Sequence, residues 1–180
     1  MGEQSAQDQQ KPAKKIRRAK YWLKEGVMII IVFIVFSTIM DYWRSQDMPD
    51  GSIPPLVAQT VQGESIDLVT LSRDKPVMIY FWATWCPACK FVTPTVDWMS
   101  RDFEVISVAI TSGENRRLNA FMENQGYSFR VINDSNGTLG REWGITATPS
   151  IVIIKDGKIV SATTGITTPP GLWLRMLLNS

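Results

Sequence analysis

The chain has 180 residues, 44% hydrophobic and 20% charged, which is the size of one globular domain with an appendage. Histidine is absent, which excludes serine triads, cysteine–histidine proteases, histidine-ligated zinc hydrolases and haem sites with a histidine ligand. The net charge is only +2, and seven of the 19 basic residues precede Gly26, which favours a membrane neighbour over nucleic acid.

The N-terminal segment predicts a membrane anchor. Residues 1–20 are polar and basic and predict a tail without a core. The sequence GVMIIIVFIVFSTIM over 26–40 carries no charge, and aromatic pairs at both ends extend it toward the ~20 residues that a spanning helix needs. We therefore predict one transmembrane helix over 21–43. A cleaved signal peptide is the alternative, because Val35–Ser37 is a passable cleavage site.

The charges that flank this helix predict its orientation. Seven basic residues precede it, against Arg44 just after it, so the tail is expected in the cytoplasm and the rest of the chain outside. Residues 44–52 read as a polar linker, and a folded domain is expected over 53–180. The two cysteines therefore face an oxidising compartment.

The domain alternates short apolar runs with helical patterns, which predicts an α/β fold with a mixed central sheet flanked by helices. The hairpin turn KDGK is expected between the last two strands. In the last helix we expect Leu172, Trp173, Met176 and Leu177 to face the core. Expected strands are 77–82, 105–110, 129–132, 151–154 and 159–163, and expected helices are 92–103, 114–125, one around Leu139 and Trp143, and 170–178.

The cysteine pair carries the predicted chemistry. The segment FWATWCPACK over 81–90 follows an expected strand and opens an expected helix, with Pro87 in its first turn. Amide hydrogens at a helix N-terminus favour the thiolate of Cys86, which we expect to be exposed, while Cys89 lies one turn further in. Cys86 would attack a substrate disulfide, and Cys89 would then resolve the mixed disulfide.

Several motifs resemble the thioredoxin superfamily over most of 53–180. They are the strand that enters WATWCPACK, Pro94 inside the following helix, and the sequence ATPS over 147–150. The resemblance implies a thioredoxin-like fold with a cis peptide bond before Pro149 and catalysis by Cys86 and Cys89. It also implies that an extended substrate pairs with the backbone of Thr148. The implied substrate-binding residues are Trp85, Pro87, Ala88, Thr148 and Pro149.

The anchor, the WATWCPAC wording and the extra helix over 114–125 are similar to the TlpA group, and the phrase LSRDKP is most similar to the suppressor-of-copper-sensitivity D proteins. This resemblance implies a bacterial inner-membrane protein with its catalytic domain in the periplasm. It implies that the chain reduces protein disulfides with electrons from a membrane donor of the DsbD or CcdA type. A connection to copper tolerance rests on the resemblance alone.

Two positions depart from the family pattern. Tyr80 stands where thioredoxin carries a buried acid, and Val92 stands where some TlpA-type reductases carry a glutamate. Both expected proton acceptors are therefore missing, which leaves the direction of exchange open.

Two alternatives to a reductase remain at this point. The same cysteines could oxidise or isomerise disulfides, or they could bind copper(I) with help from Met78, Met99 or Met122. Zinc would need two further ligands, and the chain has no histidine and no other cysteine. We therefore expect no metal and no cofactor beyond the redox-active disulfide, and no nucleic-acid partner.

Overall fold

The structure is a computed structural model that describes residues 24–29, 31–32, 53–54 and 56–179. It divides into two units, Met1–Tyr42 and Trp43–Ser180. In the first unit the described residues are helical, and their apolar side chains are exposed. None of the helices within the described ranges is both long and apolar enough to cross a membrane. The predicted tail, most of the predicted anchor and the predicted linker lie outside the described residues.

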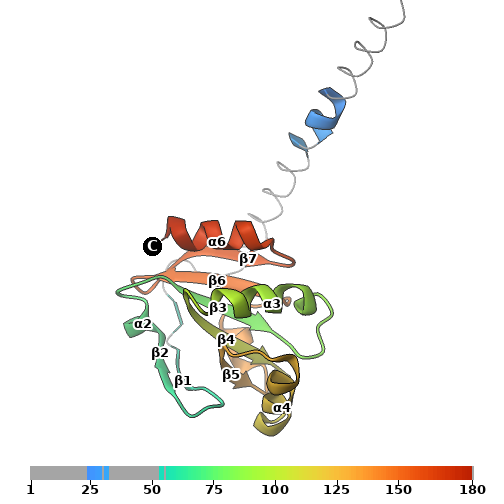
Figure 1. Cartoon of the computed structure of the whole chain (residues 1–180). Coiled ribbons are helices and arrows are strands. Elements are labelled where there is room, and N and C mark those ends of the chain that lie inside the picture. Colours follow the sequence, from blue (N-terminus) through green and yellow to red (C-terminus); the bar gives the residue numbers. More distant parts are fainter. Residues whose placement is uncertain (1–23, 30, 33–52, 55, 180) are drawn as a thin grey trace, which may run out of the picture. The chain divides into compact units, whose positions relative to one another are not determined.

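A five-stranded mixed sheet forms the centre of the second unit, in the order β5-β4-β3-β6-β7 (Figure 1). The central strand β3 runs parallel to β4 and antiparallel to β6. All six residues of β3 are buried, as its unbroken apolar sequence predicts. The mixed sheet and its five predicted strands are confirmed. Their bounds are β3 Val77–Trp82, β4 Glu104–Ile110, β5 Arg130–Asp134, β6 Ser150–Lys155 and β7 Lys158–Thr164.

Helices cover both faces of this sheet, because alternate side chains of β3 enter two separate cores. Tyr80 and its alternate neighbours pack with α3 (Cys89–Met99), α4 (Asn115–Gln125) and α6 (Pro169–Leu178). Ile79 and its alternate neighbours pack with residues of α2 (Leu68–Leu71) and α5 (Thr138–Glu142) and with the hairpin of β1 (Val57–Gln59) and β2 (Ser65–Asp67). The α/β architecture with flanking helices is therefore confirmed.

The predicted turn KDGK is also confirmed. Asp156 and Gly157 lie between β6 and β7 with φ of 52° and 70°, the left-handed conformation that a two-residue hairpin of this kind requires. Glycine adopts this conformation without steric cost, which explains the DG pair at this position.

The prediction for the last helix is half wrong. Leu172 and Met176 are fully buried, whereas Trp173 and Leu177 are 43% and 42% exposed. Leu172 and Met176 are four positions apart, so they lie on the same face of α6. Trp173 and Leu177 each follow them by one position and therefore lie to the side of that face. The stripe that meets the sheet is thus narrower than the apolar sequence suggests.

Candidate functional site

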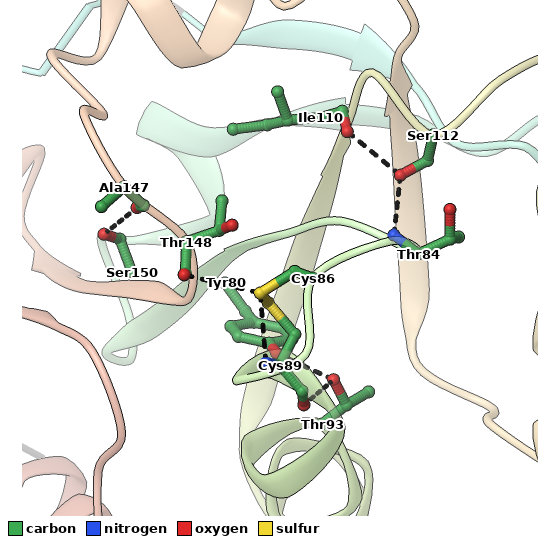
Figure 2. The surroundings of a disulfide bond; sticks show 10 residues. All are labelled: Tyr80, Thr84, Cys86, Cys89, Thr93, Ile110, Ser112, Ala147, Thr148 and Ser150. Atoms are coloured by element: carbon green, nitrogen blue, oxygen red, sulfur yellow. Dashed lines mark hydrogen bonds between the residues drawn. A yellow bond between two sulfur atoms is a disulfide. The ribbon is translucent and has the colours of Figure 1, made fainter.

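The two cysteines lie where β3 gives way to α3, and they form a disulfide (Figure 2). Both side chains are buried, with Cys86 4% and Cys89 2% exposed. The expectation that Cys86 is exposed is therefore wrong for the disulfide form. The loop at Thr148 covers it, since the carbonyl oxygen of Thr148 lies 3.5 Å from the Cys86 sulfur.

One backbone amide points at the Cys86 sulfur. The N–H of Cys89 donates to it across 3.2 Å. The next two amides are engaged elsewhere, since Lys90 donates to the carbonyl of Pro87 and Phe91 to that of Ala88. Hence a Cys86 thiolate would receive one direct amide hydrogen bond, in addition to the field of the helix.

The position of Pro87 corrects a prediction. α3 begins at Cys89, so Pro87 lies in the turn before the helix and not in its first turn. The hydrogen bonds in this turn join residues three apart, as in a 3₁₀ turn. The carbonyl of Pro87 accepts one of them, from the N–H of Lys90. Pro87 is exposed and Ala88 is half-buried.

The loop before β6 lies against the disulfide. The peptide bond between Thr148 and Pro149 is cis, as the family resemblance implies. Pro149 is buried, and its carbonyl accepts a hydrogen bond of 2.8 Å from the N–H of Gly165. The structure thus brings Thr148 and Pro149 to Cys86, although more than 60 residues separate Cys86 and Thr148 in sequence.

A second loop, between β4 and α4, also contacts the cysteine loop. The hydroxyl of Ser112 accepts a hydrogen bond of 3.0 Å from the N–H of Thr84 and donates one of 3.1 Å to the carbonyl of Ile110 (Figure 2). Ser112 is itself buried. The sequence does not mark Ser112 as a site residue, because a single serine after a strand carries no signal for a tertiary contact.

Tyr80 lies beneath the cysteines and contacts α3 through Thr93. Its hydroxyl is 2.8 Å from Oγ1 of Thr93, which in turn donates a hydrogen bond of 2.7 Å to the carbonyl of Cys89 (Figure 2). Burial raises the pKa of the Tyr80 hydroxyl well above its usual range, and the hydrogen bond with Thr93 only partly opposes this. Val92 is fully buried. Neither position therefore supplies an anionic base at neutral pH.

A cavity of about 300 Å³ opens beside the disulfide. Both cysteines line it, together with Lys90, Phe121 and Tyr127. The structure also has a larger cavity, of about 530 Å³, which is lined mainly by charged side chains and contains neither cysteine. Of these two cavities in the described part of the chain, the smaller one bears on the chemistry, because the cysteines line it and do not line the larger one.

Two observations in the described part of the chain concern the metal alternatives. Within it, no group of three or more histidine, cysteine, aspartate or glutamate side chains could hold a metal ion. Met78, Met99 and Met122 are buried and belong to the apolar core around β3 and its helices. Their packing explains these methionines without a metal.

Known proteins share this architecture. A solved structure of a thiol:disulfide interchange protein of the thioredoxin family from Chlorobium tepidum superposes with a TM-score of 0.60, at 23% identity, and covers 73% of this chain and 96% of its own. The thiol-disulfide oxidoreductase ResA of Bacillus subtilis is 26% identical over 160 residues, 84% of this chain and 89% of ResA. The chain is accordingly a thioredoxin-like protein of the thiol-disulfide oxidoreductase class, with one CxxC pair.

The family follows from two further matches. Residues 46–163 match the model of the AhpC/TSA family. A thioredoxin-like protein of Haemophilus influenzae is 34% identical over 160 residues, which is 88% of this chain and 95% of the relative. The chain belongs to the AhpC/TSA family.

Proposed function

We propose that this protein is a membrane-anchored, extracytoplasmic oxidoreductase that reduces protein disulfides through Cys86 and Cys89. One observation carries the proposal: the Cys86–Cys89 disulfide lies against the Thr148–Pro149 loop, with its sulfur 3.5 Å from the Thr148 carbonyl. A disulfide between cysteines three apart closes too small a loop to stabilise a fold appreciably, so its value is chemical.

The chemistry follows from the two positions. In the dithiol form, the Cys86 thiolate attacks one sulfur of a substrate disulfide, and the other substrate sulfur leaves as a thiolate. Cys89 then loses its proton and attacks Cys86, which breaks the mixed disulfide and releases the second substrate thiolate. Two electrons have passed to the substrate, and the Cys86–Cys89 disulfide has formed again. The amide of Cys89, 3.2 Å from the Cys86 sulfur, favours the thiolate that starts this sequence.

Substrate binding is assigned to the surface around the disulfide. Trp85 and Pro87 are exposed beside Cys86, while Ala88 and Thr148 are half-buried. An extended segment of a substrate protein would pair with the backbone of Thr148, as in other strand-addition complexes. Pro149 is buried and would hold that backbone in place from below. No metal and no organic cofactor enters this scheme.

The location rests on the N-terminal segment. The apolar run over 26–40 and the excess of basic residues before it favour a single anchor with the remainder of the chain outside the cytoplasm. The exposed apolar side chains of its described residues, such as Ile29 and Val32, also suit a lipid environment. We assign the chain to the TlpA group, in the bacterial inner membrane, and closest to the suppressor-of-copper-sensitivity D proteins. An electron donor of the DsbD or CcdA type would then reduce the disulfide again.

The first experiment uses the variant Cys89→Ser in cells that express the whole chain. If the protein exchanges disulfides, this variant retains mixed disulfides with its substrates, because nothing resolves the bond at Cys86. The matched control Cys86→Ser should capture no partner. A copper(I) carrier would instead lose metal affinity in both variants and trap no protein, which would overturn the proposal.

The direction of exchange is tested by the reduction potential of the Cys86–Cys89 couple. A value near that of thioredoxin, about −270 mV, supports a reductase supplied from a membrane donor. A value of about −120 mV lies at the strongly oxidising end of the range for thiol-disulfide oxidoreductases. It would make the protein a disulfide donor and reverse the proposed direction.

A further inference from the structure

A chain of buried hydroxyl groups links the central strand to the helix turn that carries Cys89. The Thr93 hydroxyl has one hydrogen, which it donates to the carbonyl of Cys89 at 2.7 Å. The 2.8 Å contact between the hydroxyls of Tyr80 and Thr93 must then be donated by Tyr80. The order of donation is therefore fixed, from Tyr80 in β3 through Thr93 to the backbone of Cys89.

The turn that receives this link has a missing hydrogen bond. Pro94 lies inside α3 and has no amide hydrogen, so it cannot donate to the carbonyl of Lys90, four residues before it. The first turn of α3, which carries Cys89, is thereby less well bonded to the rest of the helix. The hydroxyl of Thr93 donates to the carbonyl of Cys89, four residues earlier, and the hydroxyl of Tyr80 joins this pair to the sheet. Tyr80 thus attaches the first turn of α3 to β3 independently of the hydrogen bonds within the helix.

The link matters most once the disulfide is open. In the oxidised form the covalent bond holds Cys89 to Cys86. In the dithiol and in a mixed disulfide this bond is broken. Tyr80 and Thr93 are 0% and 2% exposed in the disulfide form, and because they are packed in the core we expect them to stay in place when the disulfide opens. Burial keeps the Tyr80 hydroxyl protonated, because it raises the pKa of that group, so the donor persists over the pH range in which thiols titrate.

We propose that Tyr80 and Thr93 are positioning residues for the resolving step, which hold Cys89 within reach of Cys86 while the disulfide is open. The proposal rests on the exchange at Cys86 and Cys89 proposed above and does not depend on its direction. Neither side chain acts as a base. They increase the effective concentration of the Cys89 thiol at the Cys86 sulfur. This raises both the rate at which Cys89 attacks Cys86 and the equilibrium constant for forming the disulfide.

The two chemical steps can be timed separately with the disulfide reagent DTNB, using the reduced 180-residue chain in detergent micelles. Attack by Cys86 releases a first coloured thiolate at a rate proportional to the reagent concentration. Attack by Cys89 on the mixed disulfide releases a second one at a rate independent of that concentration. We expect Tyr80→Phe to slow the second release about threefold to tenfold, as for loss of one buried hydrogen bond, and to leave the first within about twofold.

Equilibration with glutathione gives an independent reading. The equilibrium constant for forming the Cys86–Cys89 disulfide should fall by the same factor as the second rate, and a tenfold fall corresponds to about 30 mV toward a more oxidising couple. Thr93→Val should reproduce both effects. Thr93→Ser keeps the hydroxyl and should have the same second rate and the same equilibrium constant as the wild type.

The matched control is Ser100→Ala. The hydroxyl of Ser100 donates a hydrogen bond of 2.7 Å to the carbonyl of Asp97 at the other end of α3, and Ser100 does not line the cavity beside the cysteines. This variant should leave both phases unchanged. Equal slowing of both phases in Tyr80→Phe, or an unchanged second phase in Tyr80→Phe and Thr93→Val, would overturn the inference. A wild-type chain without a second phase would instead contradict the exchange function itself.

Discussion

The indole Nε1 of Trp85 donates a hydrogen bond to the backbone carbonyl of Thr111, 3.2 Å away, between the loops that follow β3 and β4. Trp85 is 62% exposed, yet this bond fixes one edge of its ring. Because the neighbouring Thr84 is bound by Ser112, the loop after β4 holds the cysteine loop at two consecutive residues. The ring is therefore an ordered part of the surface next to Cys86 and is suited to contact a substrate.

Replacing Trp85 by alanine should impair exchange with proteins but not with small reagents. The ring offers contact area to a polypeptide that DTNB does not need, and buried aromatic contacts carry much of the energy of protein recognition. We expect kcat/KM for insulin reduction to fall about tenfold, while the rate of the first DTNB phase stays within about twofold. Trp85→Phe keeps a ring but loses the hydrogen bond to Thr111. Its kcat/KM for insulin should lie between those of the wild type and Trp85→Ala.

The control for this prediction is Trp98→Ala. Trp98 is also an exposed tryptophan, at 47%, but it lies on α3 nine residues beyond Cys89. It should leave both assays unchanged. If Trp85→Ala slowed DTNB and insulin equally, Trp85 would act on the reactivity of Cys86 and not on substrate binding.

The inner strands of the sheet were predictable because they are buried on both sides. Such strands are continuous apolar runs, and VMIYFW over 77–82 coincides with β3. The hairpin of β1 and β2 and the four-residue α2 were not predicted. Each strand of that hairpin has three residues, with one side chain or none buried, which is too short for periodicity to show.

In the site, the residues adjacent in sequence were predictable and their tertiary partners were not. The two cysteines, three positions apart after an apolar strand, indicate a redox motif from the sequence alone. The contacts from Thr111, Ser112 and Thr93 depend on which loops and side chains the sheet order brings together. The burial of Cys86 belongs to the same class, since it comes from a loop 62 residues further along the chain.

Asp97 should contribute measurably to stability. It is 7% exposed and accepts a hydrogen bond of 2.6 Å from the N–H of Ser128, which joins α3 to the segment before β5. Hydrogen bonds to a charged acceptor contribute about 1.5–3 kcal/mol, so Asp97→Ala should lower the free energy of unfolding by about that amount. Asp97→Asn keeps an acceptor oxygen and should lose less. Urea unfolding measures both, and equal losses would show that the packing of the side chain matters more than the bond.

The narrow stripe of α6 predicts a sharp contrast between two leucines. Leu172 is fully buried, and truncation of such a side chain to alanine costs about 2–5 kcal/mol. Leu177 is 42% exposed, so Leu177→Ala should cost less than about 1 kcal/mol. Thermal or urea unfolding of the two variants decides between this stripe and the wider one expected from the sequence, which predicts similar losses for both.

Tyr80 should make the fold sensitive to alkali. Burial raises the pKa of its hydroxyl in the folded state, whereas in the unfolded chain it titrates near 10. Above about pH 10 the unfolded chain therefore binds fewer protons than the folded one, and the free energy of unfolding falls as pH rises, by up to about 1.4 kcal/mol per pH unit for one such group. Below about pH 9 this contribution is fully present and constant.

The test compares urea unfolding of the wild type and Tyr80→Phe from pH 8 to pH 11. The variant starts less stable at pH 8 because it lacks the bond to Thr93, but its stability should fall less steeply above pH 10. Lysines titrate in both proteins, so the difference between the two curves isolates the phenol. Parallel curves would mean that Tyr80 ionises as easily in the folded chain as in the unfolded one, and that its surroundings are open to water.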